Sequence, residues 1–263
     1  MLTSPQTYKL TLAYNGQGYF GFQRQPRKKT IQSELEKAFF KILREKIVII
    51  PSGRTDTGVH ALKQVCHFDV RTKKAKARLK KKNFLNGINS VLSKGISILA
   101  CVKKSGFHAR KNAQKKTYEY LILFSKQPHP FLEGFVWRIS HPLDIQKIEK
   151  ALPFLKGRHD FSAFCASDST AKKKTREIFS ITLSHNNPCS FFKISDEKFL
   201  RIQITGSGFL KQMVRNIVGT LVEVGKKKRG PNDLKIILKT KDRCKAGFTA
   251  PAKGLYLKKI FYA

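Results

Sequence analysis

The predicted strands and helices follow the same order in both halves of this 263-residue chain. Alternating or β-branched runs predict strands, and apolar residues three or four apart predict helices. Residues 8–102 give the order strand, helix, strand, strand, helix, strand, and residues 115–262 repeat it with insertions. A ferredoxin-like unit has this order. We therefore expect an α+β protein of two similar ferredoxin-like (β-α-β-β-α-β) subdomains with antiparallel sheets, residues 1–105 and 106–263, and a cleft between them.

Individual elements are predicted from caps and apolar faces. Thr30 and Asp144 are placed to cap helices, and an apolar stripe over residues 209–224 predicts the longest helix. Arg215 lies at the border of this stripe, so it should be partly buried and should need a carboxylate partner. Further helices are predicted over residues 31–42, 84–92, 145–155 and 231–238, and strands over residues 8–14, 47–50, 64–70, 96–102, 115–124, 176–183, 191–194, 199–204 and 255–262.

The charge of the chain limits its partners. Its 53 Lys and Arg against 17 Asp and Glu give a formal charge of +36, which implies a polyanion. Nucleic acid is the first candidate and an acidic membrane surface the second, although no apolar run is long enough to span a membrane and residues 1–10 lack the apolar region typical of a signal peptide. We expect a cytoplasmic protein. The basic runs at residues 71–82, 111–116 and 226–229 are candidate phosphate contacts, or merely solvated faces.

The most distinctive polar stretch is residues 52–61, which lies between two predicted strands. Gly53 and Gly58 permit backbone angles that other residues resist, and Arg54 and Asp56 stand between them. A carboxylate two residues from a guanidinium should favour its charged form, which suits a nucleophile or an ionic anchor better than a proton donor. A charged surface turn is the alternative interpretation of this motif when it is taken alone.

Other kinds of active site are disfavoured. The Asp-Thr-Gly of residues 56–58 could be half of an aspartic-protease site, but the chain has no second copy, and Arg54 would oppose a proton shared between two carboxylates. There is no phosphate loop of the Gly-x4-Gly-Lys-Ser/Thr kind, which argues against an ATP-driven enzyme and a nucleotide cofactor.

A glycine-rich segment at residues 15–21 has the spacing of a dinucleotide-binding fingerprint. The fingerprint needs a helix directly after its third glycine, whereas Pro26 indicates that a loop follows here. The aromatic residues Tyr19, Phe20 and Phe22 of this loop could stack on bases, or they could lie buried in a hairpin.

The sequence predicts no metal site. His60, Cys66, His67 and Asp69 lie close together, but Cys66 and His67 face opposite sides of a predicted strand, and no second cluster offers the remaining ligands. The five cysteines are scattered without a Cys-x-x-Cys pair, so neither a disulfide framework nor a zinc site is expected.

Six motifs occur in one order along nearly the whole chain: Gly-Arg-Thr-Asp-Thr-Gly-Val-His-Ala at 53–61, Phe-His-Ala-Arg at 107–110, Lys-Thr-Tyr-Glu-Tyr at 116–120, Gly-Arg-His-Asp-Phe-Ser-Ala-Phe at 157–164, Gly-Phe-Leu-Lys-Gln-Met-Val-Arg-Asn-Ile-Val-Gly at 208–219, and Ala-Pro-Ala-Lys-Gly-Leu-Tyr-Leu at 250–257. Together they resemble the TruA family of tRNA pseudouridine synthases. One position departs from the family pattern, because Thr57 stands where the family usually has alanine after its catalytic aspartate.

The resemblance implies a pseudouridine synthase fold and a homodimer that acts on tRNA without a cofactor or a required metal. Family members isomerise uridine to pseudouridine in the anticodon stem-loop, typically at tRNA positions 38, 39 and 40. A non-enzymatic RNA-binding protein built from two ferredoxin-like halves is the alternative. Asp56 discriminates between the two, because a carboxylate that faces phosphates is of no use to a simple binder.

The resemblance also implies roles for four residues. Asp56 matches the nucleophile, which attacks either C1′ of the ribose or C6 of the base. Tyr118 matches a tyrosine that stacks on the target base and assists proton removal from C5. Arg215 matches an arginine that pairs with the catalytic aspartate, and Arg54 matches one that helps to extrude the target nucleotide.

Overall fold

The chain divides into two compact units, each with strands and helices of its own. The computed structural model describes residues 2–185 and 198–263, with side chains from residue 4 onward. The first unit holds residues 1–114 together with 257–263, and the second holds residues 115–256. A first subdomain that ends at residue 105, as expected from the sequence, does not include this return of the last strand.

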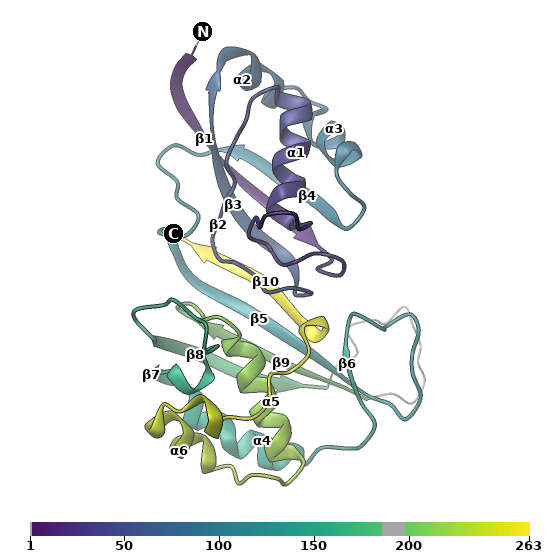
Figure 1. Ribbon diagram of the computed structural model, residues 1–263, viewed down its shortest axis with the longest axis vertical. Coiled ribbons are helices and arrows are strands. Elements are labelled where there is room, and N and C mark those ends of the chain that lie inside the picture. Colours follow the sequence, from purple (N-terminus) through teal and green to yellow (C-terminus); the bar gives the residue numbers. More distant parts are fainter. Residues whose placement is uncertain (1, 186–197) are drawn as a thin grey trace. The chain divides into compact units, whose positions relative to one another are not determined.

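The first unit is an antiparallel sheet with three helices beside it (Figure 1). The strand β1 lies between β4 and β3, the short β2 pairs with β3, and β10 follows β3 in the strand order. Strands predicted over residues 8–14, 64–70 and 96–102 are found within β1, β3 and β4. The elements are β1 (Leu2–Tyr14), α1 (Ile31–Leu43), β2 (Ile50–Pro51), β3 (His60–Thr72), α2 (Lys73–Leu79), α3 (Phe84–Val91), β4 (Ile96–Lys103) and β10 (Leu255–Tyr262).

Helix α1 begins at the predicted cap and covers one face of this sheet. The Thr30 hydroxyl accepts a hydrogen bond from the backbone N–H of Ser33, whose side chain accepts one from the N–H of Thr30. Phe39 packs edge-on against Phe68 of β3, with the ring centroids 4.8 Å apart, and also approaches Phe84 of α3. The apolar side of the sheet therefore faces α1 and α3.

One prediction for the first unit is wrong in part. A strand was expected over residues 47–50, but only Ile50–Pro51 pairs with β3, and Ile47 and Ile49 are buried without joining the sheet. The basic run at residues 71–82 contains a helix of its own, α2. The Thr72 hydroxyl caps it by accepting a hydrogen bond from the N–H of Ala75.

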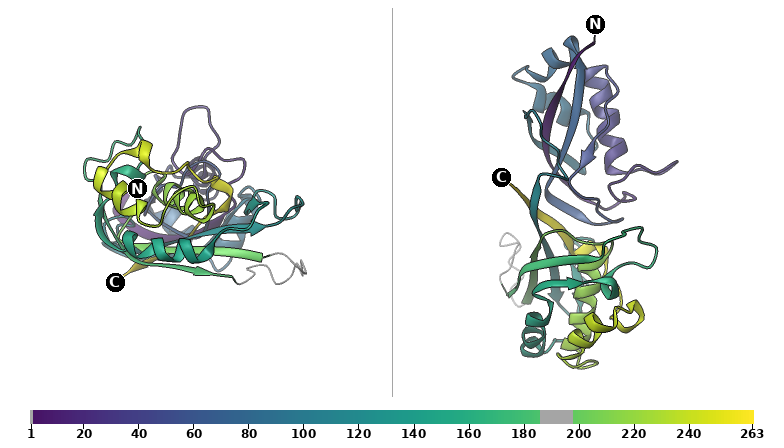
Figure 2. Two further views of the ribbon diagram at one scale, coloured as in Figure 1. Left: turned by 90° about the horizontal axis from the view of Figure 1, so that it is seen from below. Right: turned by 90° about the vertical axis from the view of Figure 1, so that its left-hand side faces the viewer.

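The second unit has a sheet in the order β5-β9-β8-β7, with β6 beside β5. Seen from below, α5 and α6 stand on one side of its strands (Figure 2). The elements are β5 (Ala113–Phe124), β6 (Trp137–Ile139), α4 (Ile145–Ala151), β7 (Gly157–Asp160), β8 (Thr175–Ser184), β9 (Lys198–Gly206), α5 (Met213–Gly225) and α6 (Asp233–Thr240), with short 3-10 helices at Leu152–Leu155, Ser162–Phe164, Arg243–Lys245 and Ala252–Gly254.

The expectation of purely antiparallel sheets is wrong for this unit. The pairs β5–β9, β9–β8 and β8–β7 are antiparallel, but β6 runs parallel to β5, so the sheet is mixed. The sequence did not predict β6 and β7 because strands of three or four residues are too short for a periodic pattern to identify. The strand predicted over residues 191–194 lies outside the described residues.

Helix α5 begins at Met213, four residues later than its apolar stripe predicts. The chain before it is held to its neighbours, because the N–H of Ser207 donates to the carbonyl of Glu177 and the carbonyl of Lys211 accepts from Ala166. Gln212 then takes a left-handed conformation with a φ of 60°. These contacts prevent residues 209–212 from joining the helix. Asp144 caps α4 as predicted, by accepting a hydrogen bond from the N–H of Lys147.

Within the described ranges, none of the helices combines the length and the apolar character that a membrane crossing requires.

Candidate active site

The four predicted site residues lie two in each unit. Arg54 and Asp56 belong to the loop between β2 and β3 of the first unit, where Arg54 is exposed and Asp56 is half-buried. Tyr118 lies on β5 and Arg215 on α5 of the second unit. Arg215 is partly buried, as its place at the border of the apolar stripe predicts.

Hydrogen bonds with buried side chains of the first unit's core hold the loop of residues 52–61. The Tyr14 and Thr55 hydroxyls lie 2.8 Å apart, and both side chains are buried. Gln64, which is fully buried on β3, donates from its amide to the carbonyl of Gly53 at 2.9 Å and to the Tyr14 hydroxyl at 3.4 Å. Burial raises the pKa of Tyr14, so its hydroxyl keeps its proton at neutral pH and can donate to Thr55.

The glycine-rich segment after β1 packs directly against this loop. Gly21 has a φ of +75°, and a Cβ there would lie 2.8 Å from the carbonyl oxygen of Thr55 and about as close to the backbone of Asp56, at 3.2 Å. A Cβ at Gly16 would lie 2.2 Å from the carbonyl oxygen of Val59. These glycines therefore allow the segment after β1 to approach the backbone of the loop of residues 52–61. This close packing explains the glycine spacing without a dinucleotide-binding site.

The aromatic residues of the same segment mostly serve the core. Tyr19 and Phe22 are buried, and only Phe20 remains substantially exposed. The backbone N–H of Phe22 donates to the carbonyl of Thr55 at 3.1 Å, which ties this segment to the residue before Asp56. Of the two interpretations of these aromatics, burial is confirmed for Tyr19 and Phe22.

Tyr118 lies on β5 of the second unit, next to β9. It pairs with Ile204 of β9, and its side chain is buried. Its ring meets the ring of Phe209 edge-on, with centroids 5.1 Å apart. Phe209 belongs to the non-helical stretch before α5. The late start of that helix therefore leaves the Phe209 ring packed against Tyr118.

The segment before β10 grips Arg215. Its Nε donates to the carbonyl of Ala250 at 2.7 Å, and the N–H of Ala250 donates back to the carbonyl of Arg215 at 3.1 Å. The carbonyl of the next residue, Pro251, accepts from the Tyr120 hydroxyl at 2.7 Å. Burial raises the pKa of Tyr120, and the nearby Arg215 guanidinium partly opposes that shift.

A polar network that the sequence did not reveal supports this grip. Asn216 is fully buried, and its Oδ1 accepts from the Thr249 hydroxyl at 2.7 Å and from Arg243 at 3.1 Å. Arg243 also donates to the carbonyl of Gly247 at 2.9 Å. The available signal was an asparagine within an apolar helical face, because a buried amide needs partners. It could not identify those partners.

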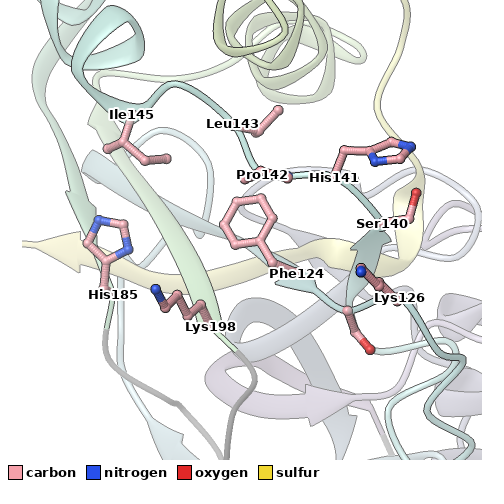
Figure 3. A pocket seen from close by; sticks show the side chains of 10 residues that line it. Phe124, Lys126, Ser140, His141, Pro142, Leu143, Ile145, His185 and Lys198 are labelled. Carbon is pink, nitrogen blue, oxygen red and sulfur yellow. The ribbon is translucent and has the colours of Figure 1, made fainter.

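A pocket of about 440 Å³ lies in the second unit, near the C-terminal end of β5 and the start of β9. Phe124 points into its middle, between Pro142 on one side and Lys198 on the other (Figure 3). None of the four predicted site residues lines it. Among residues 2–185 and 198–263 there is also no cluster of three or more His, Cys, Asp or Glu side chains placed to hold a metal ion.

Comparisons with known proteins identify the family. The family profile described as tRNA pseudouridine synthase matches residues 11–99 and 151–263. The tRNA pseudouridine synthase A of Thermoanaerobacter sp. (strain X514) is 41% identical over 254 residues, which are 96% of this chain and 98% of that protein. The chain belongs to the tRNA pseudouridine synthase family.

Other family members match over the same extent. The tRNA pseudouridine synthase A of Caldicellulosiruptor bescii is 40% identical over 96% of this chain and 98% of its own length. That of Ligilactobacillus salivarius is 39% identical over 98% of this chain and 96% of its own length. The family profile includes Arg54, Asp56 and Arg215, whereas Tyr118 falls between its two matched ranges.

Proposed function

We propose that the protein isomerises uridine to pseudouridine in the anticodon stem-loop of tRNA, at positions 38, 39 and 40. One observation carries this function: relatives named tRNA pseudouridine synthase A match almost the whole chain at 39–41% identity. The formal charge of +36 supports a polyanionic substrate. The four residues that match the family's site carry the reaction.

The reaction rearranges bonds without exchanging electrons. The bond between N1 of uracil and C1′ of the ribose breaks, and C5 of the same base then joins C1′. One proton leaves C5 and one is added to N1, so product and substrate are isomers and no oxidant or reductant is consumed. Asp56 is the nucleophile, at C1′ or at C6, and its place on a loop held from below by buried contacts favours a fixed attacking group.

Three residues assist this nucleophile. Tyr118 stacks on the target base and assists proton removal from C5. Arg215 pairs with Asp56 and keeps it ionised, which is consistent with an Nε that the carbonyl of Ala250 holds in place. Arg54, whose side chain is exposed on the same loop as Asp56, enters the stem as the uridine leaves the stack. Extruding a base costs a few kcal/mol, which contacts of this kind must offset.

We further propose that the enzyme works as a cytoplasmic homodimer. In the second unit Phe131 is 71% exposed and Phe135 is 36% exposed, and apolar side chains left exposed in this way are often covered by a partner. Light scattering on the purified protein measures the mass of the particle. A monomer at micromolar concentration would contradict this part.

The function is tested by incubating the protein with unmodified tRNA and mapping pseudouridine. Wild-type protein should form it, and Asp56→Asn should form none while binding tRNA at least as tightly, because the variant keeps the size of the side chain but loses the charge that repels phosphate. Asp168→Asn is the matched control, because that carboxylate is exposed and makes only a surface ion pair with Lys211.

Two results would contradict this function. Activity of Asp56→Asn within tenfold of wild type would exclude Asp56 as the nucleophile. Tight binding of tRNA by wild-type protein with no pseudouridine formed would favour the non-enzymatic RNA-binding alternative.

A further inference from the structure

Two lysines of the first unit share an aromatic surface. The Lys9 ammonium lies 4.9 Å from the ring centroid of Tyr262 and 5.4 Å from that of Phe107. The Lys104 ammonium lies 5.5 Å from the centroid of the same Phe107 ring. The faces of aromatic rings attract cations, so these rings hold both ammonium groups in one place.

These two charges are not neutralised by a salt bridge to any described residue. Burial lowers the pKa of Lys9, and the charge of Lys104 lowers it further. Asp69, on the neighbouring strand β3, instead accepts a hydrogen bond from the Thr7 hydroxyl at 2.6 Å. Two ammonium groups that repel each other and form no salt bridge among the described residues gain from a bound anion.

The space beside them can take such an anion. A pocket of about 400 Å³ opens next to Lys104, and the Phe107 and Tyr262 rings form part of its wall. Ser105, Asn112 and Gln114 add hydrogen-bonding side chains, and Ala263 also lines the pocket. A pocket with cationic and amide donors suits an oxyanion, and the aromatic wall suits the sugar or base next to it.

Lys9 also lies on the face of the sheet that the helices leave uncovered. On β1 its neighbours Tyr8 and Leu10 are buried and the Tyr8 ring stacks on Phe68, against which α1 packs, so Lys9 points to the opposite side. Its partner across the sheet is His67 of β3. A polymer can therefore reach this site without displacing a helix.

We propose that Lys9 and Lys104, with the rings of Phe107 and Tyr262, bind a backbone phosphate of the RNA substrate. This site rests on the proposed function, because it takes tRNA as the polyanion. It adds a phosphate contact in the first unit, apart from the four residues assigned to the reaction. Contacts of this kind fix the position of a nucleic acid and add affinity that falls with salt.

The salt dependence of tRNA binding tests the site. Affinity for an unmodified tRNA transcript is measured over a series of salt concentrations for wild type and for Lys9→Gln/Lys104→Gln. The double variant should bind more weakly, and the slope of log affinity against log salt should become shallower by about 1, the change expected for one lost phosphate contact.

The control changes the same charge elsewhere. Lys235→Gln/Lys239→Gln removes two exposed lysines of α6 that make no salt bridge among the described residues, and it should leave the slope unchanged. Lys9→Arg/Lys104→Arg keeps both charges and the stacking, so it should retain the wild-type slope. Circular dichroism of each variant identifies a loss of slope that is due only to misfolding.

The outcomes separate this site from the enzyme function. A double variant whose slope equals that of wild type would overturn the phosphate site, whether or not pseudouridine forms. A shallower slope in a protein that makes no pseudouridine would support the site and contradict the function. Binding of inorganic phosphate, seen as shifts of the Lys9 side-chain resonances, together with an unchanged tRNA slope would show a small-anion site and also overturn the proposal.

Discussion

The Asp56 loop of the first unit and the Arg215 helix of the second unit are held in different ways. Around Asp56 the structure fixes the backbone, through the Thr55 hydroxyl beneath the loop and the close approach of Gly21. At Arg215 it fixes the side chain itself, because Nε donates to the carbonyl of Ala250. A fixed backbone tolerates a change at the tip of a side chain, whereas a gripped side chain does not.

This difference indicates which substitutions at Asp56 and Arg215 leave the surrounding hydrogen bonds intact. Asp56→Asn leaves the contacts beneath the loop in place. Any shortening of Arg215 also removes the donor on which the segment around Ala250 depends. Functional effects at the loop should therefore be purely chemical, and those at the helix should combine chemistry with local loosening.

The largest effect is expected from the two arginines. Arg215→Leu should lower the single-turnover rate by about 100-fold or more, the scale of losing one electrostatic partner in an active site. The acidic limb of its pH–rate profile should also move to higher pH, because the pKa of a carboxylate rises when a neighbouring cation is removed. Arg54→Leu should chiefly slow base extrusion, so a substrate whose target uridine is unpaired should partly restore its rate.

Single-turnover pH profiles on paired and unpaired substrates measure both effects. Arg54→Lys and Arg215→Lys serve as controls that keep the charge and lose the planar guanidinium. Indistinguishable profiles for the two leucine variants would remove the proposed division of labour and leave the role of Asp56 untouched.

The next largest effect concerns the backbone support of the loop. Gly21→Ala should destabilise the first unit by about 1–3 kcal/mol, because its Cβ would meet the carbonyl of Thr55 at 2.8 Å. Gly18→Ala is the matched control, since Gly18 has a similar φ of +72° and open space around its Cβ position. Gly18→Ala therefore carries only the cost of a left-handed alanine, roughly 1 kcal/mol.

The corresponding change in the second unit is Gly219→Ala. Its Cβ would lie 1.8 Å from the carbonyl oxygen of Phe248, close to the segment that grips Arg215. Gly87→Ala in α3 meets nothing within 4 Å, so it should be neutral or should stabilise by up to about 1 kcal/mol through helix propensity. Urea unfolding gives the four free energies. Equal effects of Gly219→Ala and Gly87→Ala would show that the helix can shift away from Phe248.

The sequence predicted those parts of the molecule whose causes are local. The caps at Thr30 and Asp144 and the partial burial of Arg215 follow from neighbouring residues and helical spacing, and the structure confirms them. The start of α5 was missed because the chain before it is tied to distant segments, Ser207 to the carbonyl of Glu177 and the carbonyl of Lys211 to Ala166. Periodicity cannot detect a partner that is thirty residues away.

The same limit applies to the site. The loop with Arg54 and Asp56 was identified from its composition, but its supports come from segments remote in sequence. Tyr14 contacts Thr55 of the loop across a sequence separation of 41 residues, and in the second unit Thr249 reaches Asn216 across a separation of 33 residues. A buried amide indicates that partners must exist, and only the fold shows which residues they are.

A smaller effect compares one hydroxyl in each region. Thr249→Val removes the donor to Asn216, and Thr55→Val removes the partner of the Tyr14 hydroxyl, so each should cost about 1 kcal/mol of stability. Only Thr249→Val should also move the acidic limb of the pH–rate profile to higher pH, as expected for Arg215→Leu. The reason is that losing the Thr249 hydroxyl loosens the segment that holds the Arg215 side chain. Serine at either position restores the hydroxyl and should rescue the loss. A pH shift in Thr55→Val as well would show that backbone support also governs the charge of the site.

The smallest effect is expected from two carboxylates away from the site, one in each unit. Burial alone would raise the pKa of Glu45, but the Thr72 hydroxyl and the N–H groups of Arg71 and Thr72 outweigh it and lower the pKa. In the second unit, burial alone would raise the pKa of Asp160. The hydrogen bonds from Ser162 and the ammonium of Lys241 outweigh burial and lower that pKa.

A carboxylate whose pKa is lower in the folded state binds fewer protons there than in the unfolded chain, so its contribution to stability is present above its unfolded pKa and is lost as the pH falls. Glu45→Gln and Asp160→Asn should each destabilise at pH 7, on the order of 1 kcal/mol, and the difference from wild type should shrink below about pH 4. Urea unfolding at the two pH values measures this. The fluorescence of Trp137, the single tryptophan of the chain, follows the second unit, and far-UV circular dichroism follows the whole chain. A difference that persists unchanged at low pH would show that these side chains act through packing and not through their charge.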